Sequence, residues 1–463
     1  MGKIQPVILM LWVIGVLLLP NTTAVTLTAL AALALKSSGQ IILHRQRLPV
    51  RTSKALLIVV LAFLLTLIAS LLIPFVLLPA IPPLQPLGVL IAWTILLPLD
   101  RFLKHRIFHQ AAALRESMHD AVVIGIAGSV GKTTTKELLK HLLRDLRPLA
   151  TPEHVNTEMG VAQWIVRERS AMSDERPAVL IVEMGAYRKG EIKLMCSYAK
   201  PTIGVVTALG SDHLALFGSE EAIIDANAEL IEALPPAGQA FLYADNESTR
   251  EIADRSPCSV TLAGLHEGSA MHADHAEQTD RGLRFTTGGT TYEVALHGLH
   301  NVGNVLLSMA VAQHLGVSQE RIRELLMSFQ PLRHTFHVYE ERGILLLDDT
   351  YNSSRLSIRA ALDWAAKRPE HPRVLLLSDL QETGPDEDRF LEELGTHAAS
   401  MIDRAIFTTE TGRKAFEKGY GKAVELLGSQ TQKVQSGSAL LCVGRMPLSF
   451  IQRLLPQPEP KPA

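Results

Sequence analysis

The stretch AVVIGIAGSVGKTTTKELLKHLL, Ala121–Leu143, decides the fold of this 463-residue chain. Its first seven residues form an apolar run that predicts a buried strand, and its last eleven carry apolar side chains at helical spacing. Between them lie Gly128 and Gly131, and Lys132 follows. These glycines are three residues apart, whereas the usual pattern G-x-x-x-x-G-K-[ST] would need a glycine at Ile126. The sequence therefore predicts a shortened glycine loop between a strand and a helix.

A loop of this kind is suited to bind phosphate. Glycines let backbone N–H groups approach an anion, and the N-terminus of the following helix favours negative charge. Lys132 adds a cation, and Thr133 supplies a hydroxyl group for Mg²⁺. The predicted phosphate-binding residues are Gly128, Ser129, Val130, Gly131, Lys132, Thr133 and Thr134.

The chain begins with an unusually apolar segment. Residues 1–110 contain nine Lys and Arg but one acidic residue, Asp100, so the totals of 45 basic and 47 acidic residues leave 36 and 46 downstream. Because the basic residues 1–110 are also the most apolar part of the chain, their charge indicates a membrane as the partner and argues against nucleic acid. The three cysteines lie far apart in the sequence, which excludes a disulfide framework and a thiolate zinc site.

Four apolar stretches precede the loop, namely Ile4–Leu19, Thr23–Leu35, Ala55–Leu78 and Leu84–Leu99. A bilayer span needs about 20 apolar residues, and the third stretch is long enough. Basic residues cluster at 36–54 and 101–106, and the positive-inside rule places both clusters in the cytoplasm. We therefore expect a membrane segment over residues 1–108, with up to four transmembrane helices and with the later domains in the cytoplasm.

Further motifs follow in order along the chain. They are HVNTEMGV (His154–Val161), VEMGAYRKGEI (Val182–Ile192), GSDHLALFGS (Gly210–Ser219), GLHNVGN (Gly298–Asn304), LDDTYNSS (Leu347–Ser354) and LLLSDLQETG (Leu375–Gly384). Together with the loop they resemble the Mur ligases, most of all the D-Ala-D-Ala-adding branch (MurF), over residues 121–455. The resemblance implies a ligase that uses ATP and Mg²⁺ to form an amide bond through an acyl phosphate, in bacterial cell-wall precursor synthesis. It also implies that the membrane is the bacterial inner membrane.

The resemblance assigns catalytic roles to three residues. Lys132, with the loop amides, would hold the β- and γ-phosphates of ATP. Glu183, at the end of an apolar strand, would bind the first Mg²⁺ together with Thr133, and His213 would approach a second Mg²⁺. Without the resemblance, a strand-end glutamate is more often solvated and a lone histidine is more often structural.

Other positions match the family's nucleotide and substrate contacts. Asn301 would contact adenine and Asp349 the ribose, while Tyr351 and Asn352 would shape the junction between two domains. From the residues alone, Asn301 is an ordinary helix-start residue and Asp349 ends a plain strand. The residues expected on the substrate side are Asn156, Asp379 and Glu382.

The alternation of strands and helices predicts an α/β fold with parallel, Rossmann-like sheets. After the helical membrane segment we expect a P-loop Mur ligase central domain over residues 115–330 and a Rossmann-like C-terminal domain over 331–455. The segment Pro331–Arg342 is expected to join them. The proline-rich tail, residues 456–463, is expected to be disordered.

Several positions depart from the family. Asn227 stands where the family has a lysine whose carbamate bridges the second metal, and it offers only a neutral carbonyl oxygen to a cation. Thr335 stands in place of an arginine, and Val443-Gly444-Arg445 in place of K-G-S. The family's domain for the uridine-nucleotide end of the substrate is expected to be replaced by the apolar segment. We therefore expect a carboxylate acceptor presented at the lipid bilayer, in lipid-linked form, and an amino acid or dipeptide as the amine.

Three functions remain open from the sequence. The first is a membrane-anchored ATP-dependent amide ligase, and the second is a membrane poly-amino-acid ligase. The third is an ATP-binding scaffold or regulator among envelope-synthesis proteins, with degraded ligase chemistry. The departures at Asn227, Thr335 and Val443 favour the scaffold, whereas the intact loop, Glu183, His213 and Asp349 favour the ligases.

Overall fold

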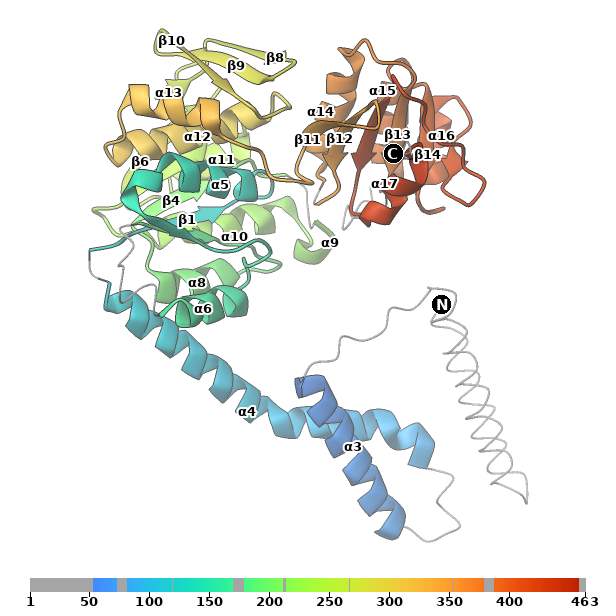
Figure 1. The fold of residues 1–463 in the computed structure, drawn as a ribbon. Helices are drawn as coiled ribbons and strands as arrows, with labels where there is room; N and C mark the ends of the chain where they lie inside the picture. The colour runs from blue at the N-terminus through green and yellow to red at the C-terminus, as the bar shows by residue number, and fades with distance from the viewer. Residues whose placement is uncertain are drawn as a thin grey trace, which may run out of the picture. The chain divides into compact units, whose positions relative to one another are not determined.

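The computed structural model describes residues 53–72, 81–118, 120–169, 179–210, 214–265, 267–351, 353–378 and 387–457. The chain divides into two compact units, Met1–Arg106 and Ile107–Ala463. The described part of the first unit consists of α3 (Ser53–Leu72) and the beginning of α4 (Ile81–Glu116), whose last residues belong to the second unit (Figure 1).

The predicted membrane location is contradicted. No helix in the described part of the chain is long and apolar enough to cross a membrane. Lys54 lies at the start of α3, and charged residues occupy α4 from Asp100 onwards. Lys54 and Asp100 form an ion pair of 2.8 Å. The first two predicted spans, in residues 4–35, lie outside the described residues.

A parallel seven-stranded sheet forms the centre of the second unit. Its strand order is β2-β3-β1-β4-β5-β6-β7. The strands are β1 (Val122–Ala127), β2 (Pro148–Ala150), β3 (Val179–Glu183), β4 (Ile203–Val206), β5 (Gln239–Tyr243), β6 (Ser259–Gly264) and β7 (Met271–His272). The strand order reverses direction at β1, and ligands of such sheets bind beyond the carboxyl ends of the strands at this switch point.

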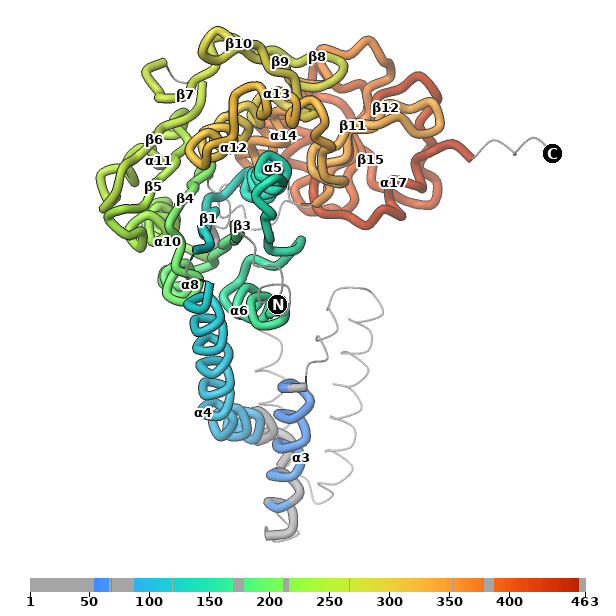
Figure 2. Tube along the Cα trace, turned by 60° about the vertical axis from the view of Figure 1, so that its left-hand side comes forward, coloured from blue at the N-terminus to red at the C-terminus, as the bar shows by residue number. Residues whose placement is uncertain are grey.

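Helices cover both faces of this sheet, which explains the apolar strand sequences. One face carries α5 (Lys132–Leu142), α12 (Asn301–His314) and α13 (Gln319–Ser328). The other carries α6 (Glu158–Arg167), α8 (Glu191–Ala199), α10 (Glu220–Glu232) and α11 (Glu247–Ala253). The short α9 (Leu214–Phe217) precedes α10, and the 3-10 turn Arg144–Leu146 follows α5. Figure 2 shows the two layers from a second direction.

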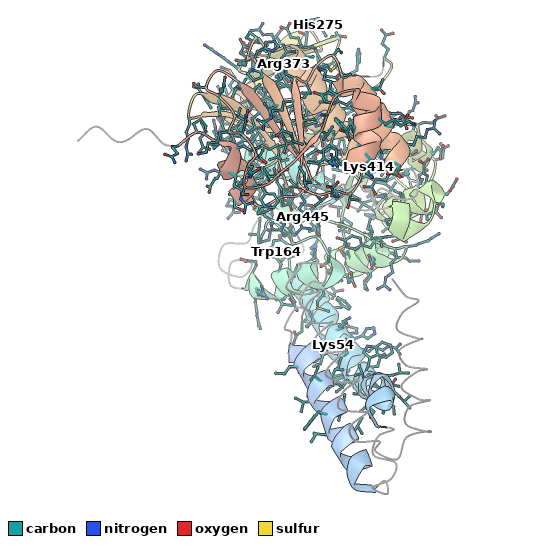
Figure 3. All side chains as sticks on the ribbon, turned by 90° about the vertical axis from the view of Figure 1, so that its right-hand side faces the viewer. Lys54, Trp164, His275, Arg373, Lys414 and Arg445 are labelled. Carbon is teal, nitrogen blue, oxygen red and sulfur yellow. The ribbon has the colours of Figure 1, made fainter. Side chains whose placement is uncertain are left out.

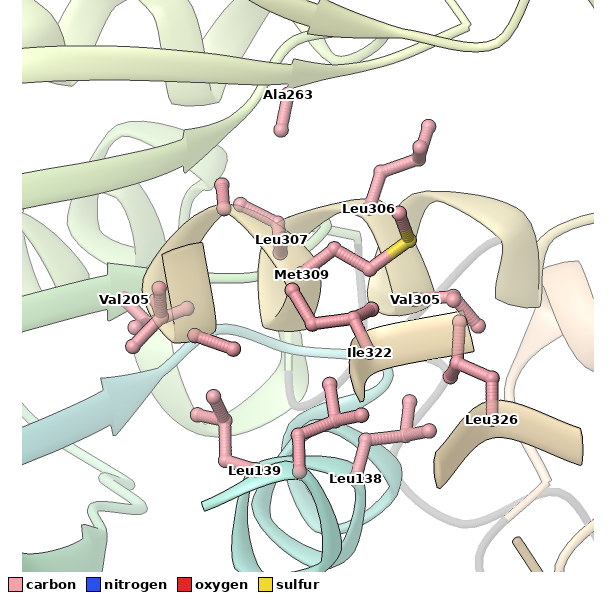
Figure 4. Packing of buried hydrophobic residues seen from close by; sticks show 14 of the residues in the cluster. Leu138, Leu139, Val205, Ala263, Val305, Leu306, Leu307, Met309, Ile322 and Leu326 are labelled. Atoms are coloured by element: carbon pink, nitrogen blue, oxygen red, sulfur yellow. The ribbon is translucent and has the colours of Figure 1, made fainter. Parts of the chain in front are cut away.

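Alternate residues of β1 pack into two separate cores. Ile124 and Ile126 face α5 and α12, whereas Val123 and Ala127 belong to the cluster on the opposite face. The core between the sheet and α12 is dominated by leucines and other aliphatic side chains, several of which are labelled in Figure 4. Burial on this scale fixes the position of β1 and α5, and hence of the loop between them.

Two further sheets complete the second unit. An antiparallel sheet contains β8 (His275–Thr279), β9 (Gly282–Thr287) and β10 (Thr290–Val294). A six-stranded sheet has the order β11-β12-β16-β13-β14-β15. Its strands are β11 (His337–Glu341), β12 (Ile344–Asp349), β13 (Arg373–Leu377), β14 (Arg404–Phe407), β15 (Glu425–Leu426) and β16 (Ala439–Val443).

The six-stranded sheet is parallel except at its edge. Strand β11 pairs antiparallel with β12, and the others pair in parallel. Its helices are α14 (Arg355–Ala366), α15 (Glu387–Ala398), α16 (Arg413–Tyr420) and α17 (Leu448–Leu454). The α/β prediction with parallel sheets is therefore confirmed, except that part of the expected junction, residues 331–342, is the edge strand β11.

Candidate functional site

The glycine loop between β1 and α5 has a backbone that only glycine adopts easily. Gly128 has φ +131° and Gly131 has φ +91°. A Cβ atom on Gly128 would lie 2.1 Å from the hydroxyl oxygen of Thr207, and one on Gly131 would lie 2.3 Å from the side-chain oxygen of Asn304. Both the backbone angle and the lack of space therefore require glycine at these two positions.

The loop lies at the carboxyl edge of the sheet, before the N-terminus of an 11-residue helix. The amides of Ser129 and Val130 both donate to the carbonyl oxygen of Ala208, at 3.0 Å. Lys132 Nζ donates to the carbonyl oxygens of Gly128, at 2.5 Å, and Ser129, at 2.9 Å. The partial positive charge of the helix N-terminus and the Lys132 ammonium group thus meet at one place, which suits a phosphate group.

The structure brings Thr133 and Glu183 together across 50 residues of sequence. Thr133 Oγ1 donates towards the Glu183 carboxylate, 3.1 Å from Oε1 and 3.2 Å from Oε2. Glu183 ends β3 and its side chain is 4% exposed. Asn156, predicted on the substrate side, donates from Nδ2 to Glu183 Oε1 at 3.2 Å.

A buried lysine that received no role from the sequence also contacts this carboxylate. Lys136 is fully buried in α5, and its Nζ lies 3.2 Å from Glu183 Oε2 and 3.6 Å from Glu137 Oε1. A buried charge is tolerated only when it is paired. The sequence signal was the helical spacing, because a lysine four residues after Lys132 lies on the same side of the helix.

The pair of Thr133 and Glu183 fits Mg²⁺. Among the described residues, no three His, Cys, Asp or Glu side chains are placed to hold a metal ion together. Mg²⁺, however, is usually bound by one or two protein oxygens together with phosphate oxygens and water. The Thr133 hydroxyl and the Glu183 carboxylate supply two such oxygens beside the loop. His213, predicted near a second Mg²⁺, lies outside the described residues.

A cavity of about 360 Å³ contains most of the predicted site. Its wall includes the loop and helix start, Gly128–Thr134, together with Asn156, Glu183 and Asn227 from the central sheet's side. The residues that line it from the C-terminal side are Thr335, Tyr351, Ser354 and Arg445. The side chains are drawn in Figure 3, where Arg445 is labelled.

Arg445 shows how the departure from K-G-S is accommodated. Val443 is the last residue of β16 and is fully buried in the core of the six-stranded sheet. Thr335 lines the cavity but carries no charge. Arg445, two residues after Val443, is the charged residue that lines the cavity from this side, so a cation remains in the wall although the family's lysine position is apolar.

Tyr351 contacts the first of the predicted motifs directly. Its hydroxyl lies 2.9 Å from His154 Nδ1, and the two ring centroids are 4.9 Å apart. Burial raises the pKa of the Tyr351 phenol, and the nearby Glu183 acts in the same direction. The tyrosine thus joins the turn after β12 to the segment before α6. Its predicted neighbour Asn352 lies outside the described residues, as do Asp379 and Glu382.

Asn301 and Asp349 are buried and do not line this cavity. Asn301 Nδ2 donates to the His297 carbonyl at 2.8 Å, and its Oδ1 accepts from Asn304 Nδ2 at 2.9 Å. Asp349 Oδ1 accepts from the amide of Phe336 at 3.1 Å. Asp349 Oδ2 is buried with no hydrogen-bond partner among the described residues, and burial raises the pKa of the carboxyl. Their nucleotide contacts stay predictions.

A second cavity, of about 590 Å³, adjoins the first through Val130 and Ser354. Three arginines line it, and two of them, Arg355 and Arg359, lie over the ring of Phe390 at 4.7 and 5.6 Å. The third, Arg389, bonds to Glu393, which also contacts Arg359. The sequence did not predict these residues, because arginines on helices that match no motif do not indicate that they line one cavity.

Comparison with known proteins identifies both domains. Residues 126–312 match the Mur ligase middle domain, and residues 335–441 match the Mur ligase, glutamate ligase domain. The chain is 31% identical over 350 residues to the UDP-N-acetylmuramoyl-tripeptide–D-alanyl-D-alanine ligase of Synechocystis, covering 75% of this chain and 73% of that one. It spans between 60% and 73% of the length of the eight similar curated relatives.

Solved structures share the fold. A crystal structure of MurF from Acinetobacter baumannii has a TM-score of 0.68 at 23% identity, over 76% of this chain and 80% of that one. The structure of MurF ligase from Thermotoga maritima, in complex with ADP, has a TM-score of 0.65 at 24% identity, over 75% and 82%. At this identity the likeness establishes the fold. The two domain matches and the curated relative from Synechocystis confirm the resemblance deduced from the motifs.

Proposed function

Because the chain belongs to the Mur ligase family of ATP-dependent acid–amino-acid ligases, we propose that it joins an amino acid or dipeptide to a peptide carboxylate through an acyl phosphate. The observation that carries this proposal is the contact between Thr133 and Glu183, in one cavity with Lys132 and Arg445. A nucleotide triphosphate, its metal and a carboxylate all need this combination of cations and oxygen ligands.

The proposed reaction has two steps. An oxygen of the substrate carboxylate attacks the γ-phosphorus of ATP, the bond from that phosphorus to the β–γ bridging oxygen breaks, and ADP leaves. The amine nitrogen then attacks the acyl carbon, the C–O bond to phosphate breaks, and phosphate and one proton leave. Mg²⁺, when bound, would offset the charge of the crowded phosphates.

The residues of the cavity position these groups. Lys132 and the N-terminus of α5 hold the β- and γ-phosphates, and Thr133 with Glu183 holds the metal. Arg445 faces the γ-phosphate from the C-terminal domain and stabilises charge as phosphate is transferred. We retain the other predicted roles as part of the proposal: Asn301 at adenine, Asp349 at the ribose, Tyr351 and Asn352 at the domain junction, and Asn156, His213, Asp379 and Glu382 towards the second metal or the substrates.

The substrates are proposed from the relatives and from the second cavity. The curated relatives are named as ligases of UDP-N-acetylmuramoyl-tripeptide and D-alanyl-D-alanine. We propose substrates of these classes, with the carboxylate of the amine substrate near Arg355, Arg359 and Arg389, since guanidinium groups bind carboxylates well. The predicted lipid-linked acceptor depended on the membrane location that the structure contradicts, so a peptide acid replaces it here.

The test is amine-dependent turnover by the full chain. Mg-ATP, UDP-N-acetylmuramoyl-tripeptide and D-alanyl-D-alanine are expected to give equal amounts of ADP and phosphate, with little ADP when the amine is omitted. Labelling the carboxylate with ¹⁸O is expected to place one labelled oxygen in the released phosphate, as an acyl phosphate requires. The variant Lys132→Met is the control without the loop cation. Tight binding of ATP with no amine-dependent ADP for any peptide acid would favour the scaffold instead.

A further inference from the structure

Asn227 holds the first residue of the phosphate loop. It lies in α10 with its side chain 6% exposed. Asn227 Oδ1 accepts a hydrogen bond from the amide of Gly128 at 2.7 Å, and Nδ2 donates to the carbonyl oxygen of Ile223 at 2.8 Å. These two bonds fix the orientation of the side-chain amide, because a flipped amide would place a donor against the Gly128 N–H.

The bond to Gly128 continues to the cation of the loop. The carbonyl oxygen of Gly128 accepts from Lys132 Nζ at 2.5 Å. One residue of the loop is therefore held from both sides, by Asn227 at its N–H and by Lys132 at its C=O. Since Gly128 has a left-handed backbone and no room for a Cβ atom, the loop can shift little at this point without losing both bonds.

We propose that Asn227 is the positioning residue of the phosphate loop. It fixes Gly128 from α10, so that Lys132 and the amides at the start of α5 are already in place when the triphosphate of ATP arrives. This inference rests on the proposed function, because it assumes that the loop binds ATP. It gives Asn227 a task that differs from that of the family's lysine.

A lysine cannot perform this task. An ammonium group has three donors and no acceptor, so it cannot accept from the Gly128 amide. It would also add a positive charge to the cavity that Lys132 already lines. Asn227 has a side-chain amide and no amine, so it cannot form the carbamate of the family's lysine, and its Nδ2 donates to Ile223 instead. The position is built for a neutral group that both accepts and donates.

Glu229, two residues further along α10, provides a matched control. Its side chain is 5% exposed, its Oε1 accepts from the amide of Gly190 at 2.6 Å, and its Oε2 accepts from the amide of Lys193 at 2.9 Å. Asn227 and Glu229 thus both accept from backbone amides, Asn227 from the phosphate loop and Glu229 from the start of α8. Neither Gly190 nor Lys193 lines the cavity that contains the phosphate loop.

The experiment compares Asn227→Ala with Glu229→Ala in the full chain. We measure the melting temperature, the Kd for Mg-ATP by calorimetry, and the hydrogen exchange of the Gly128 amide without nucleotide. Both variants are expected to melt at lower temperature. Only Asn227→Ala is expected to weaken Mg-ATP binding, by roughly ten-fold, and to accelerate exchange at Gly128, because a buried donor has lost its acceptor.

Each outcome decides the question. Equal Mg-ATP affinity in wild type and Asn227→Ala would overturn the inference, and so would an equal loss in Glu229→Ala. If wild type itself binds no Mg-ATP, the proposed function fails, whereas the exchange measurement still tests the contact with Gly128. If Asn227→Ala does not fold, hydrogen exchange of the wild-type protein alone tests the inference. Exchange of its Gly128 amide as fast as that of an exposed amide would refute the positioning role.

Discussion

The hydroxyl group of Tyr351 lies 2.9 Å from Nδ1 of His154, although 197 residues separate them in the sequence. Tyr351 follows β12 of the six-stranded sheet, and His154 precedes α6 of the seven-stranded one. His154 has a left-handed backbone with φ +65°, which a residue with a side chain seldom adopts. Both side chains line the cavity of the phosphate loop, so this contact links the two domains at the site itself.

The first prediction concerns this contact. Tyr351→Phe keeps the ring and removes the hydroxyl, and we expect a loss of about 1 kcal/mol in the free energy of unfolding together with a several-fold lower kcat. A double-mutant cycle with His154→Ala measures the coupling directly by urea denaturation and steady-state kinetics. The effects of two residues in contact should not be additive. Strict additivity in both measurements would show that the contact does not matter.

The second prediction separates metal binding from stability at Glu183. Glu183→Gln breaks the shorter of the two ion pairs of the fully buried Lys136 and leaves it only the 3.6 Å contact with Glu137, and breaking a buried ion pair costs about 3–5 kcal/mol. We expect Glu183→Gln to unfold at much lower urea concentration and to lose the Mg²⁺ dependence of ATP binding. The double variant Glu183→Gln/Lys136→Met also removes the buried ammonium group that has lost this partner, so its stability should return while the Mg²⁺ dependence stays lost. Recovery of both properties would show that Glu183 is only structural.

The third prediction assigns the missing family cation to Arg445. Arg445→Gln is expected to lower kcat at least ten-fold with little change in melting temperature, since the side chain lines the cavity and charge-stabilising groups contribute about 10²–10³ in rate. Lys414→Gln, on the exposed surface of α16, is the control for loss of one positive charge (Figure 3). An unchanged kcat in Arg445→Gln would show that Arg445 does not stabilise the γ-phosphate during transfer.

The fold was predictable where burial shapes the sequence. Strand β1 and helix α5 were expected from an apolar run and from helical spacing. The observed start of β1 and both observed ends of α5 differ from the prediction by one residue, and the end of β1 is as predicted. The sheet β8–β10 was not predicted because its strands contain no apolar run: polar residues separate the buried side chains of β9 and β10, and β8 has no buried position. Strand β11 lies within the predicted junction, residues 331–342. Its signal was Arg342-Gly343, a two-residue turn with φ +55° and +70° that closes a hairpin onto β12.

The site was predictable only in part, for a geometric reason. The glycine loop and the strand-end Glu183 are local features, so the sequence indicates both. The contacts of Lys136 and Asn227 depend on how α5 and α10 pack against the sheet, which no local pattern records. The apolar beginning of the chain predicted membrane spans, but none of the described helices qualifies as one.

The last prediction concerns acid stability and rests on His297. This side chain is 7% exposed, and its Nδ1 accepts from Gln278 Nε2 at 3.0 Å. Burial lowers the pKa of His297 to about 4, and the nearby Arg368 acts in the same direction. The unfolded chain, with an ordinary histidine pKa of about 6.5, therefore binds this proton at higher pH than the folded chain does. The contribution of neutral His297 to the free energy of unfolding is therefore fully present above about pH 6.5, and it is lost as the pH falls towards 4.

The pKa difference corresponds to roughly 3 kcal/mol of unfolding free energy. His297→Asn removes the titrating ring and keeps an oxygen that can accept from Gln278. Urea denaturation between pH 7 and 4.5 is expected to show a clearly smaller loss of stability in His297→Asn than in wild type. His275→Asn, an exposed histidine of β8 labelled in Figure 3, should keep the wild-type slope. Parallel curves for wild type and His297→Asn would show that protonation of this ring does not oppose folding, and that acid lability has its origin elsewhere in the chain.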